Sequence, residues 1–360
     1  MKTIFKIDLQ LFKLNSGNTN VTNDSTYSAN GDNLAAENKV YYDKNLLKNA
    51  EPELVHDQFG QERDIPKGRG KEIEFRKFSS LPKALTPLTE GVTKAGNKLD
   101  VTAITAKVDQ YGDYIVMSDV LDLTSIDNII VEATEMLGSQ AGRTLDTVTR
   151  NELNAGTNVM YAPKVTTSGT TAVTTRSGLS TDAKLTVDEI FKAVNQLKRM
   201  NVKPVDGENY ACIIHPDVEL DIMLSDKWID INKYSNAVNT IYKGEIGRIG
   251  KCRFVVSTEA RIWNDKTCPV KSAASDGNPA TYYSVYSCLF VGKNAYGTTK
   301  IDGGGLQTII KQLGSSGVAD PLNQRASVGW KAMKAAKILA EEAIVRVECC
   351  SSLSDSSKAN

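Results

Sequence analysis

The longest regular pattern in the sequence lies between residues 125 and 155, a stretch without proline. Apolar residues return there every three or four positions, at Ile126, Ile129, Ile130, Ala133, Leu137, Ala141, Leu145 and Val148. This spacing places them along one face of an α-helix. Thr124 or Ser125 offers an N-capping oxygen, and Gly156 is placed to end the helix. At about 1.5 Å per residue the helix would span roughly 45 Å, so the pattern predicts a long, beam-like helix.

Two acidic residues of this segment, Glu135 and Asp146, lie off the apolar face. We expect substitutions at either position to leave the fold intact, because polar side chains on the opposite face stay in water. Leu137 and Leu145 lie on the apolar face itself. An aspartate at either position would bury an unpaired carboxylate and is expected to destabilise the fold strongly.

Two alternating segments precede the long helix. KEIEFRKF (71–78) alternates apolar and charged residues, and residues 99–112 do the same with a phase change near Ile104, which is typical of half-exposed β-strands. The connection between them contains two prolines and two glycines, and few apolar residues near its tip. We therefore predict an extended β-hairpin. Residues 61–95 carry 8 basic and 5 acidic side chains, whereas residues 1–60 carry 6 basic and 8 acidic ones.

The first 60 residues are predicted to form an arm rather than a domain. Alternating apolar residues at 5–11 suit a short strand that adds to another sheet, and residues 40–50 suit a modest helix. Between them, residues 15–38 are rich in Asn, Ser, Thr and Gly, a composition that buries too little surface to fold alone. Charged residues interrupt every candidate leader or membrane segment, so we expect neither secretion nor a transmembrane helix.

A compact α/β domain is predicted over residues 185–292. Thr186 and Glu189 form a capping box that opens a second helix, and Pro216 suits the first turn of a short third one. Buried strands are predicted at the segments 210–215 and 283–292, and a glycine-punctuated turn that runs into a strand is predicted at 247–257. Further strands are expected in ASVGWKAMKA and EEAIVRVEC near the C-terminal end. The secondary structure of residues 331–343 is left unassigned, because their Ala and Lys content favours a helix.

The sequence contains no motif for catalysis, a cofactor or a metal. The only two histidines are His56 and His215, and the acidic residues after His215 are better explained as the favourable start of a helix. GEIGRIG (244–250) lacks the glycine spacing of a phosphate-binding loop and is interpreted as a turn. The 6 cysteines form no Cys-x-x-Cys pair and are expected to be reduced. The net charge of zero excludes a general polycation, so contact with nucleic acid should be weak.

Several collinear strings between residues 40 and 350 resemble a known family. They are NLLKNAEPELVHDQFGQ (45–61), EIEFRKFSSLPKALTPLTEGVT, QYGDYIVMSDVLDL (110–123), QAGRTLDTVTRNELNAGTN (140–158), GEIGRIGKCRFVVS (244–257) and QRASVGWKAMKAAKILAEEAIVRVE (324–348). The chain resembles the major capsid proteins of tailed double-stranded-DNA bacteriophages, which have the Hong Kong ninety-seven-type coat fold. It looks most like the subfamily of the short-tailed phages with virion RNA polymerases.

The resemblance implies an α+β phage coat fold, with an N-terminal arm, an extended β-hairpin loop, a long spine helix, a peripheral domain and an α/β axial domain. Its parts would be the arm (1–60), the extended loop with peripheral-domain strands (61–118), the spine helix and linker (119–184), the axial domain (185–295), and peripheral-domain return strands with a C-terminal tail (296–360).

The resemblance also implies a structural, non-enzymatic shell subunit that assembles in the host cytoplasm and resides in the virion. Pentamers and hexamers of the chain would enclose DNA, with portal and scaffolding proteins as further partners, weak contact with the packaged DNA, no cofactor and no membrane. The extended loop would lie over a neighbouring subunit. Its candidate subunit-interface residues are Lys83, Thr89, Glu90, Lys94 and Asn97.

Two other functions stay open from the sequence: another virion structural or nucleic-acid-binding protein, such as a tail or decoration protein, and an enzyme with an unrecognised site. Shells, sheets or capsomers in electron micrographs would favour the coat protein over both.

Overall fold

The computed structural model describes residues 46, 54–78, 81–88, 90–93, 96–120, 129–166, 169–225, 227–228, 248–273, 279–301, 304–312 and 320–360. The chain divides into two compact units. The first comprises Met1–Asn49, Gly112–Ser139 and Gln307–Lys331, and the second comprises Ala50–Tyr111, Gln140–Leu306 and Ala332–Asn360. The strand and helix expected in the arm lie outside the described residues, apart from Leu46. Among the described helices, none has the length and apolar character needed to cross a membrane.

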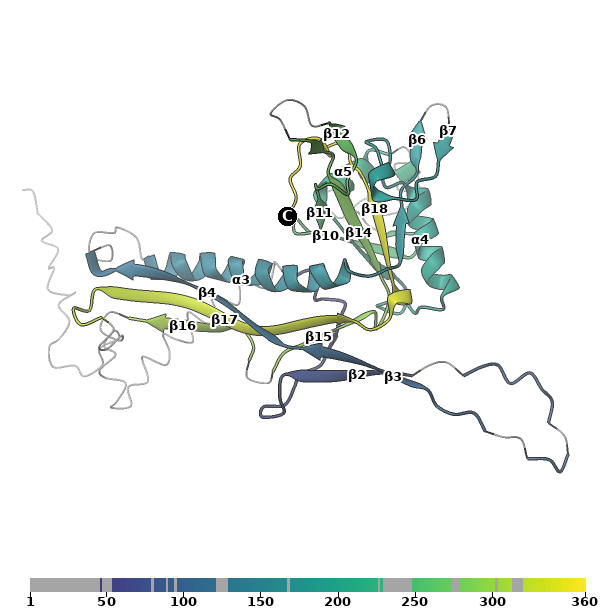
Figure 1. Cartoon of the computed structure of the whole chain (residues 1–360), viewed down its shortest axis with the longest axis horizontal. Helices are drawn as coiled ribbons and strands as arrows, with labels where there is room; N and C mark the ends of the chain where they lie inside the picture. Colours follow the sequence, from purple (N-terminus) through teal and green to yellow (C-terminus); the bar gives the residue numbers. More distant parts are fainter. Residues whose placement is uncertain are drawn as a thin grey trace, which may run out of the picture. The chain divides into compact units, whose positions relative to one another are not determined.

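A seven-stranded mixed sheet forms the centre of the second unit (Figure 1). Its strands, in spatial order, are β5 (Val159–Tyr161), β18 (Ile344–Cys349), β14 (Val285–Val291), β8 (Tyr210–Ile214), β10 (Cys252–Val256) and β9 (Arg248–Ile249), with β11 (Ile262–Trp263) pairing with β14. The pairs β5–β18 and β8–β10 are parallel, and the others are antiparallel. The strands predicted over 210–215, 247–257 and 283–292 are confirmed.

Both faces of this sheet are buried. In β8, Cys212 and Ile214 belong to one apolar core, while Ile213 belongs to another. Because successive strand residues point to opposite faces, a strand that is covered on both sides must be apolar at every position. This explains why YACII reads as a continuous apolar run in which all five residues are buried.

Helices α4 (Val187–Arg199) and α5 (Pro216–Met223) contribute to the first of these cores (Figure 1). The predicted N-cap Thr186 of α4 is confirmed, because its side chain accepts a hydrogen bond from the backbone N–H of Glu189 at 3.4 Å. The side chain of Glu189, expected to complete a capping box, instead accepts a hydrogen bond from Lys192 Nζ at 2.6 Å. At α5, the Nδ1 atom of His215 accepts the backbone N–H of Asp217 at 3.2 Å. His215 is therefore an N-cap, as expected for a helix start.

The predicted beam is helix α3 (Ile129–Leu153), which is shared by the two units. Its buried stripe includes the predicted residues Ala133, Leu137, Ala141 and Leu145, and Glu135 is exposed. The expected N-cap lies outside the described residues. The helix ends at Leu153 rather than at Gly156, whose φ is not positive.

The expectation for Asp146 is wrong. This residue is fully buried, although the helical pattern places it off the apolar stripe. Its carboxylate accepts the backbone N–H of His56 at 2.7 Å and lies 2.6 Å from Nδ1 of the same residue. A substitution at Asp146 therefore removes both contacts of a buried pair.

In the first unit, strand β4 (Asp109–Ser118) and strand β16 (Gln307–Lys311) pair with the beginning of β17 (Arg325–Ile338). Two glycines permit the close approach of β4 to β17. A Cβ on Gly112 would lie 2.6 Å from the carbonyl oxygen of Trp330, and one on Gly329 would lie 2.7 Å from the Cβ of Tyr114. Neither glycine can be replaced without moving backbone.

In the second unit, the end of β17 pairs with β15 (Tyr296–Thr299), which also pairs in parallel with β1 (Gln61–Glu62). The segment 331–343, left open from the sequence, is a strand as far as Ile338 and a 3₁₀ turn at Glu341–Ala343. Pairing with neighbouring strands overrides the helical preference of its Ala and Lys residues.

The boundary expected between residues 295 and 296 does not separate two sheets. Strand β18, expected among the return strands of 296–360, pairs with β14 from the expected axial segment. The linker segment likewise supplies β5 to the same sheet. Three short elements occupy the remaining loops: the ribbon β6 (Lys164–Thr166)–β7 (Gly169–Thr171), the 3₁₀ turn Arg176–Gly178 and the ribbon β12 (Val270–Ser272)–β13 (Thr281–Tyr282).

Candidate subunit-interface site

The predicted extended hairpin is formed by β2 (Glu72–Phe78) and β3 (Val101–Lys107). The two strands are antiparallel and in register from the pair Glu72–Lys107 to the pair Phe78–Val101. The strand expected over 99–112 is divided at Val108, after which β4 leaves to pair with β17. In Figure 1 the chain runs on beyond the ends of β2 and β3 as a long open loop.

The base of the hairpin is fixed by apolar packing within the second unit. Phe75 is buried, and its ring lies against Gly297, where a Cβ would come within 2.8 Å of Cε1. Val108 packs in a small core with Ile65 and Ala335. The alternation of 71–78 is thereby confirmed, because the inward side of β2 meets β15 while its charged side remains in water.

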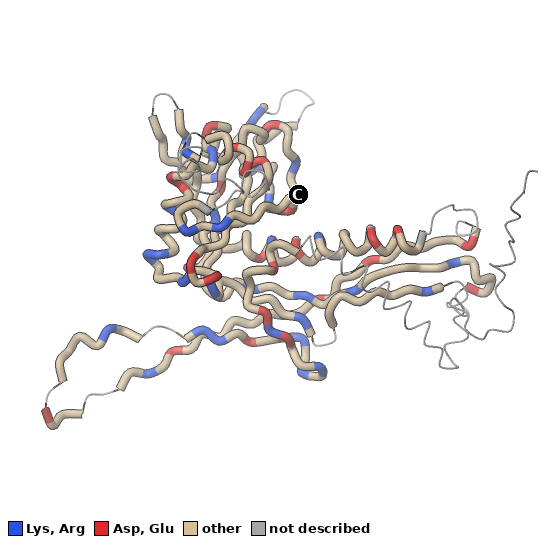
Figure 2. The backbone as a smooth tube through the Cα atoms, turned by 180° about the vertical axis from the view of Figure 1, so that it is seen from behind, with Lys and Arg blue, Asp and Glu red and all other residues tan. Residues whose placement is uncertain are grey.

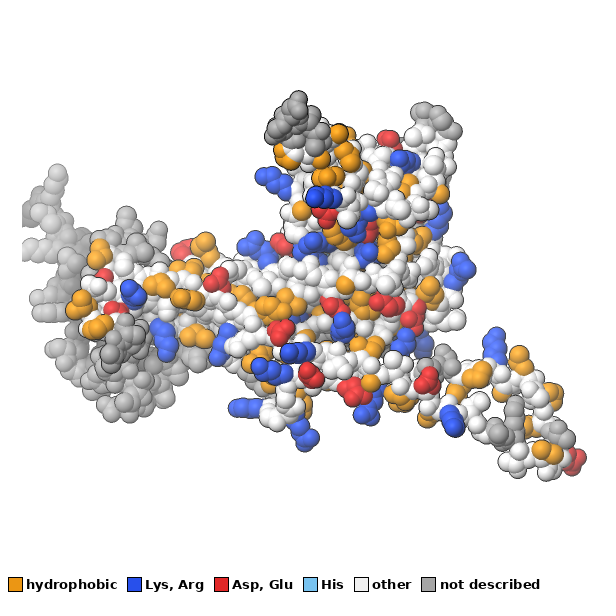
Figure 3. Space-filling model, viewed as in Figure 1, with side chains coloured by type: hydrophobic (Ala, Val, Ile, Leu, Met, Phe, Trp, Pro, Cys, Tyr) orange, Lys and Arg blue, Asp and Glu red, His pale blue; other side chains and the backbone are white. Residues whose placement is uncertain are grey.

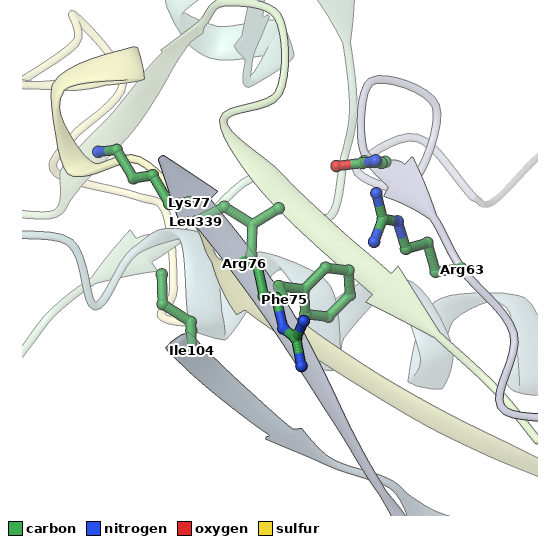
Figure 4. A pocket seen from close by; sticks show the side chains of 7 residues that line it. Arg63, Phe75, Arg76, Lys77, Ile104 and Leu339 are labelled. Carbon is green, nitrogen blue, oxygen red and sulfur yellow. The ribbon is translucent and has the colours of Figure 1, made fainter. Parts of the chain in front are cut away.

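A small cavity of about 30 Å³ lies beside this contact. Figure 4 shows Phe75, Arg76 and Lys77 from β2 and Ile104 from β3, with Arg63 approaching from another segment. The Arg63 guanidinium carbon lies 5.9 Å from the centre of the Phe75 ring, within reach of a cation–π contact. A space of this size holds about one water molecule, so it is a packing gap rather than a ligand site.

Two ion pairs tie the hairpin base and the adjoining strand to the unit. Lys77 Nζ lies 2.5 Å from Glu342 Oε1, and the hydrogen bond from Lys77 lowers the pKa of Glu342. Lys300 Nζ lies 2.7 Å from Glu62 Oε1, and this hydrogen bond lowers the pKa of Glu62 and raises that of Lys300. Both ion pairs are partly exposed, so each orients its two segments more than it stabilises the fold.

The far end of the hairpin has a different character. We call residues 85–88 and 90–93 the hairpin tip. Leu85 is 82% exposed, Leu88 is 81% exposed and Val92 is 64% exposed. Figure 3 shows apolar side chains spread along the loop. The tip exposes more apolar side chains than the sequence analysis expected. A leucine isolated between prolines and threonines belongs to no strand or helix pattern, so its importance is easily missed.

Three of the candidate interface residues, Lys83, Glu90 and Asn97, are described and exposed. Thr89 and Lys94 lie outside the described residues. Glu90 is the only acidic residue in the segment 81–98, and Figure 2 shows an acidic position at the end of the loop with basic positions along the strands. The tip therefore offers apolar side chains and one carboxylate to a partner.

The described acidic side chains near His215, elsewhere in the second unit, have structural roles. Among the described residues, no group of three or more His, Cys, Asp or Glu side chains is placed to bind a metal ion. The acidic residues after His215 have structural partners: Asp217 accepts the Tyr286 hydroxyl at 2.6 Å, and Asp221 pairs with Lys184 at 3.1 Å. An exposed apolar loop on an anchored hairpin can bind another protein surface but performs no bond chemistry.

The sequence matches the protein family described as phage capsid protein over residues 101–347. No curated protein matches it. The chain belongs to the phage capsid protein family, and this membership indicates a structural, non-enzymatic protein, as predicted.

Solved capsids of several phages have the same fold. The capsid protein of Cyanophage P-SCSP1u matches with a TM-score of 0.59 and 15% identity, over 82% of this chain and 87% of its own. That of Ralstonia phage GP4 matches with a TM-score of 0.59 and 14% identity, over 82% and 88%. That of Helicobacter pylori bacteriophage KHP30 matches with a TM-score of 0.58 and 12% identity, over 82% and 89%. The predicted α+β phage coat fold is confirmed, and the chain is a structural subunit of the virion shell.

Proposed function

We propose that this protein is the major subunit of an icosahedral capsid and self-assembles into pentamers and hexamers around double-stranded DNA. The observation that carries this proposal is the hairpin, which is anchored at Phe75 and exposes Leu85 and Leu88 at its tip. A monomer gains nothing from exposed leucines on a long loop, whereas a shell uses such overlaps to add contact area without enlarging each core.

The parts of the chain receive the roles expected from the resemblance. Residues 1–60 form the arm, 61–118 the extended loop with peripheral-domain strands, and 119–184 the spine helix and linker. Residues 185–295 form the axial domain, to whose sheet β5 and β18 are added, and the rest of 296–360 forms the return strands and tail. The length of α3 supports the spine role, and the α/β sheet with α4 and α5 supports the axial role.

Within the family, the collinear strings favour the subfamily of short-tailed phages with virion RNA polymerases. Portal and scaffolding proteins are the further partners of such a shell, and packaged DNA touches it weakly. Lys83, Thr89, Glu90, Lys94 and Asn97 are proposed to lie at the contact between neighbouring subunits.

Negative-stain electron microscopy of the expressed full chain tests the proposal. Closed shells, sheets, or rings of five and six subunits are expected. A protein that stays monodisperse and monomeric over a range of concentration and salt would refute it.

A further inference from the structure

Residues 351–360, which follow β18, cross the second unit as an irregular segment that we call the strap. Its first residues contact helix α5. The Ser351 hydroxyl donates to the Asp217 carbonyl at 3.1 Å, and the Ser352 hydroxyl donates to Asp221 Oδ1 at 2.7 Å. The strap is therefore bound to the start and the middle of a short helix.

The middle of the strap lies against the beginning of β14. Ser284, just before β14, donates its backbone N–H to the Ser354 carbonyl at 2.9 Å and its hydroxyl to the Ser357 carbonyl at 2.7 Å. The Ser357 hydroxyl donates to Asp217 Oδ2 at 2.8 Å. These contacts lead the strap from α5 across the sheet.

Asn360 makes the contact that reaches furthest. Its side chain accepts the Ile262 N–H at 3.0 Å and donates to the Ala260 carbonyl at 2.9 Å, so it lies beside β11 (Figure 1). Its backbone oxygen accepts from Arg261 Nη1 at 2.6 Å and from Arg150 Nη2 at 3.4 Å. Because Arg150 belongs to α3 and Arg261 precedes β11, this one oxygen connects the helix with the sheet.

The two guanidinium groups repel each other. Arg150 is buried, and burial lowers the pKa of Arg150, an effect to which the charge of Arg261 adds. An oxygen that accepts from both groups offsets part of this repulsion. Without it, Arg150 still donates to the Glu259 carbonyl at 2.8 Å, so the helix can stay folded while the two cations face each other unscreened.

The strap has no apolar anchor. Leu353 is 39% exposed and Ala359 is exposed, whereas Cys349 and Cys350 at the end of β18 are buried. Hydrogen bonds that water can replace each add little net stability, and a segment held by them alone opens more readily than the core. We propose that the strap is a releasable latch. When it is docked, Asn360 holds the end of α3 to the segment before β11. When it is released, Arg150 and Arg261 move apart and the end of α3 loosens, while the sheet stays folded.

The use of this latch in a shell rests on the proposed function, because a chain that fills both pentamers and hexamers needs a joint with more than one state. The latch itself is a property of the single subunit. The experiment is therefore carried out on the full chain before assembly, and its result does not depend on whether shells form.

Hydrogen exchange followed by mass spectrometry tests the latch. In the parent, residues 351–360 should exchange faster than β8 and β14. In Asn360→Ala, exchange at residues 148–153 and 258–262 should rise by about tenfold or more, while β8 and β14 keep their protection. The matched control is Lys358→Ala, at an exposed position of the strap, which should exchange like the parent.

A second variant tests the repulsion. Adding Arg261→Ala to Asn360→Ala should restore part of the protection at the end of α3, because it removes the repelling cation. The absence of any recovery would overturn the latch as described. So would a strap that exchanges as slowly as β14 in the parent, or an Asn360→Ala chain in which α3 is unchanged or the whole sheet loosens equally. Full-length chains that show the latch but form no shells would refute only the proposed function.

Discussion

His56 and Asp146 form a buried pair that joins the segment before β1 to helix α3. The backbone N–H of His56 donates to Asp146 Oδ1 at 2.7 Å, and His56 Nδ1 lies 2.6 Å from Oδ2. The Tyr296 hydroxyl donates to the His56 carbonyl, and the neighbouring Asp57 accepts the Thr149 hydroxyl at 2.6 Å. These contacts hold the segment that leads into β1 on the second unit.

Replacing Asp146 should therefore be costly. In Asp146→Ala, the N–H and ring nitrogen of His56 lose their partner in a site without solvent, and we expect the free energy of unfolding to fall by about 3–5 kcal/mol. Chemical denaturation of the isolated subunit measures this change. Arg143→Ala, at an exposed position of the same helix, is the control, and its free energy of unfolding should fall by less than about 0.5 kcal/mol. Equal stability of the two variants would show that the buried pair is not stabilising.

The apolar stripe of α3 should be equally sensitive. Leu137 is 2% exposed and Leu145 is 7% exposed, so an aspartate at either position would place a carboxylate among apolar side chains. We expect Leu137→Asp or Leu145→Asp to lower the free energy of unfolding by about 3 kcal/mol or more, and soluble yield to fall with it. Circular-dichroism melting gives the result, and a parent-like melt of either variant would contradict the helix phase.

Local patterns predicted the elements whose type can be inferred from neighbouring residues. The Thr186 cap, the buried strand of residues 210–215 and the stripe of α3 each follow from spacing alone. Asp146 was misjudged because its partner is 90 residues away, and a helical period cannot distinguish a carboxylate in water from one paired across the fold. The placement of β18 beside β14 was missed for the same reason, since the order of strands in a sheet is set by long-range pairing.

The candidate interface site was predictable only in part. Two alternating segments around a loop rich in Pro and Gly predicted the hairpin, and the resemblance drew attention to residues near Glu90. The small cavity at the hairpin base was not predictable, because Arg63, Phe75 and Leu339 come from three distant segments. None of these residues forms a motif with its sequence neighbours.

His215 should make the subunit sensitive to mild acid. Burial lowers the pKa of His215 below its ordinary value of 6.5, and the carboxylate of Asp217 only partly opposes this. The folded state thus favours the neutral ring, whose Nδ1 caps α5. Its contribution is present above the unfolded pKa and is lost as the pH falls through the folded pKa.

The variant His215→Asn isolates this effect, because asparagine keeps an N-cap acceptor but does not titrate. We expect the wild-type subunit to lose more free energy of unfolding than the variant between about pH 7 and about pH 5. Parallel pH profiles of the two proteins would exclude His215 as a source of acid sensitivity.

Isolated subunits should bind DNA weakly. The formal net charge is zero, and tight binding to a duplex requires many unneutralised cations. A gel-shift assay at physiological salt should show little complex. Tight binding that weakens steeply with added salt would instead favour a nucleic-acid-binding role for the basic side chains of residues 61–95.

The hairpin loop should be dispensable for folding and essential for assembly. Its base is fixed by Phe75 and Val108, both buried, while the described residues between the strands expose Leu85, Leu88 and Val92. Replacing residues 82–98 with a short Gly-Ser turn removes these side chains and Glu90 but keeps β2 and β3 in register. We expect a folded monomer with an almost unchanged melting temperature, and no closed shells, because the contact between neighbouring subunits is lost. Circular-dichroism melting and analytical sedimentation of the same deletion measure the two effects separately. Shells of normal size would contradict the overlap between subunits, and a collapsed melting temperature would show that the loop stabilises its own chain.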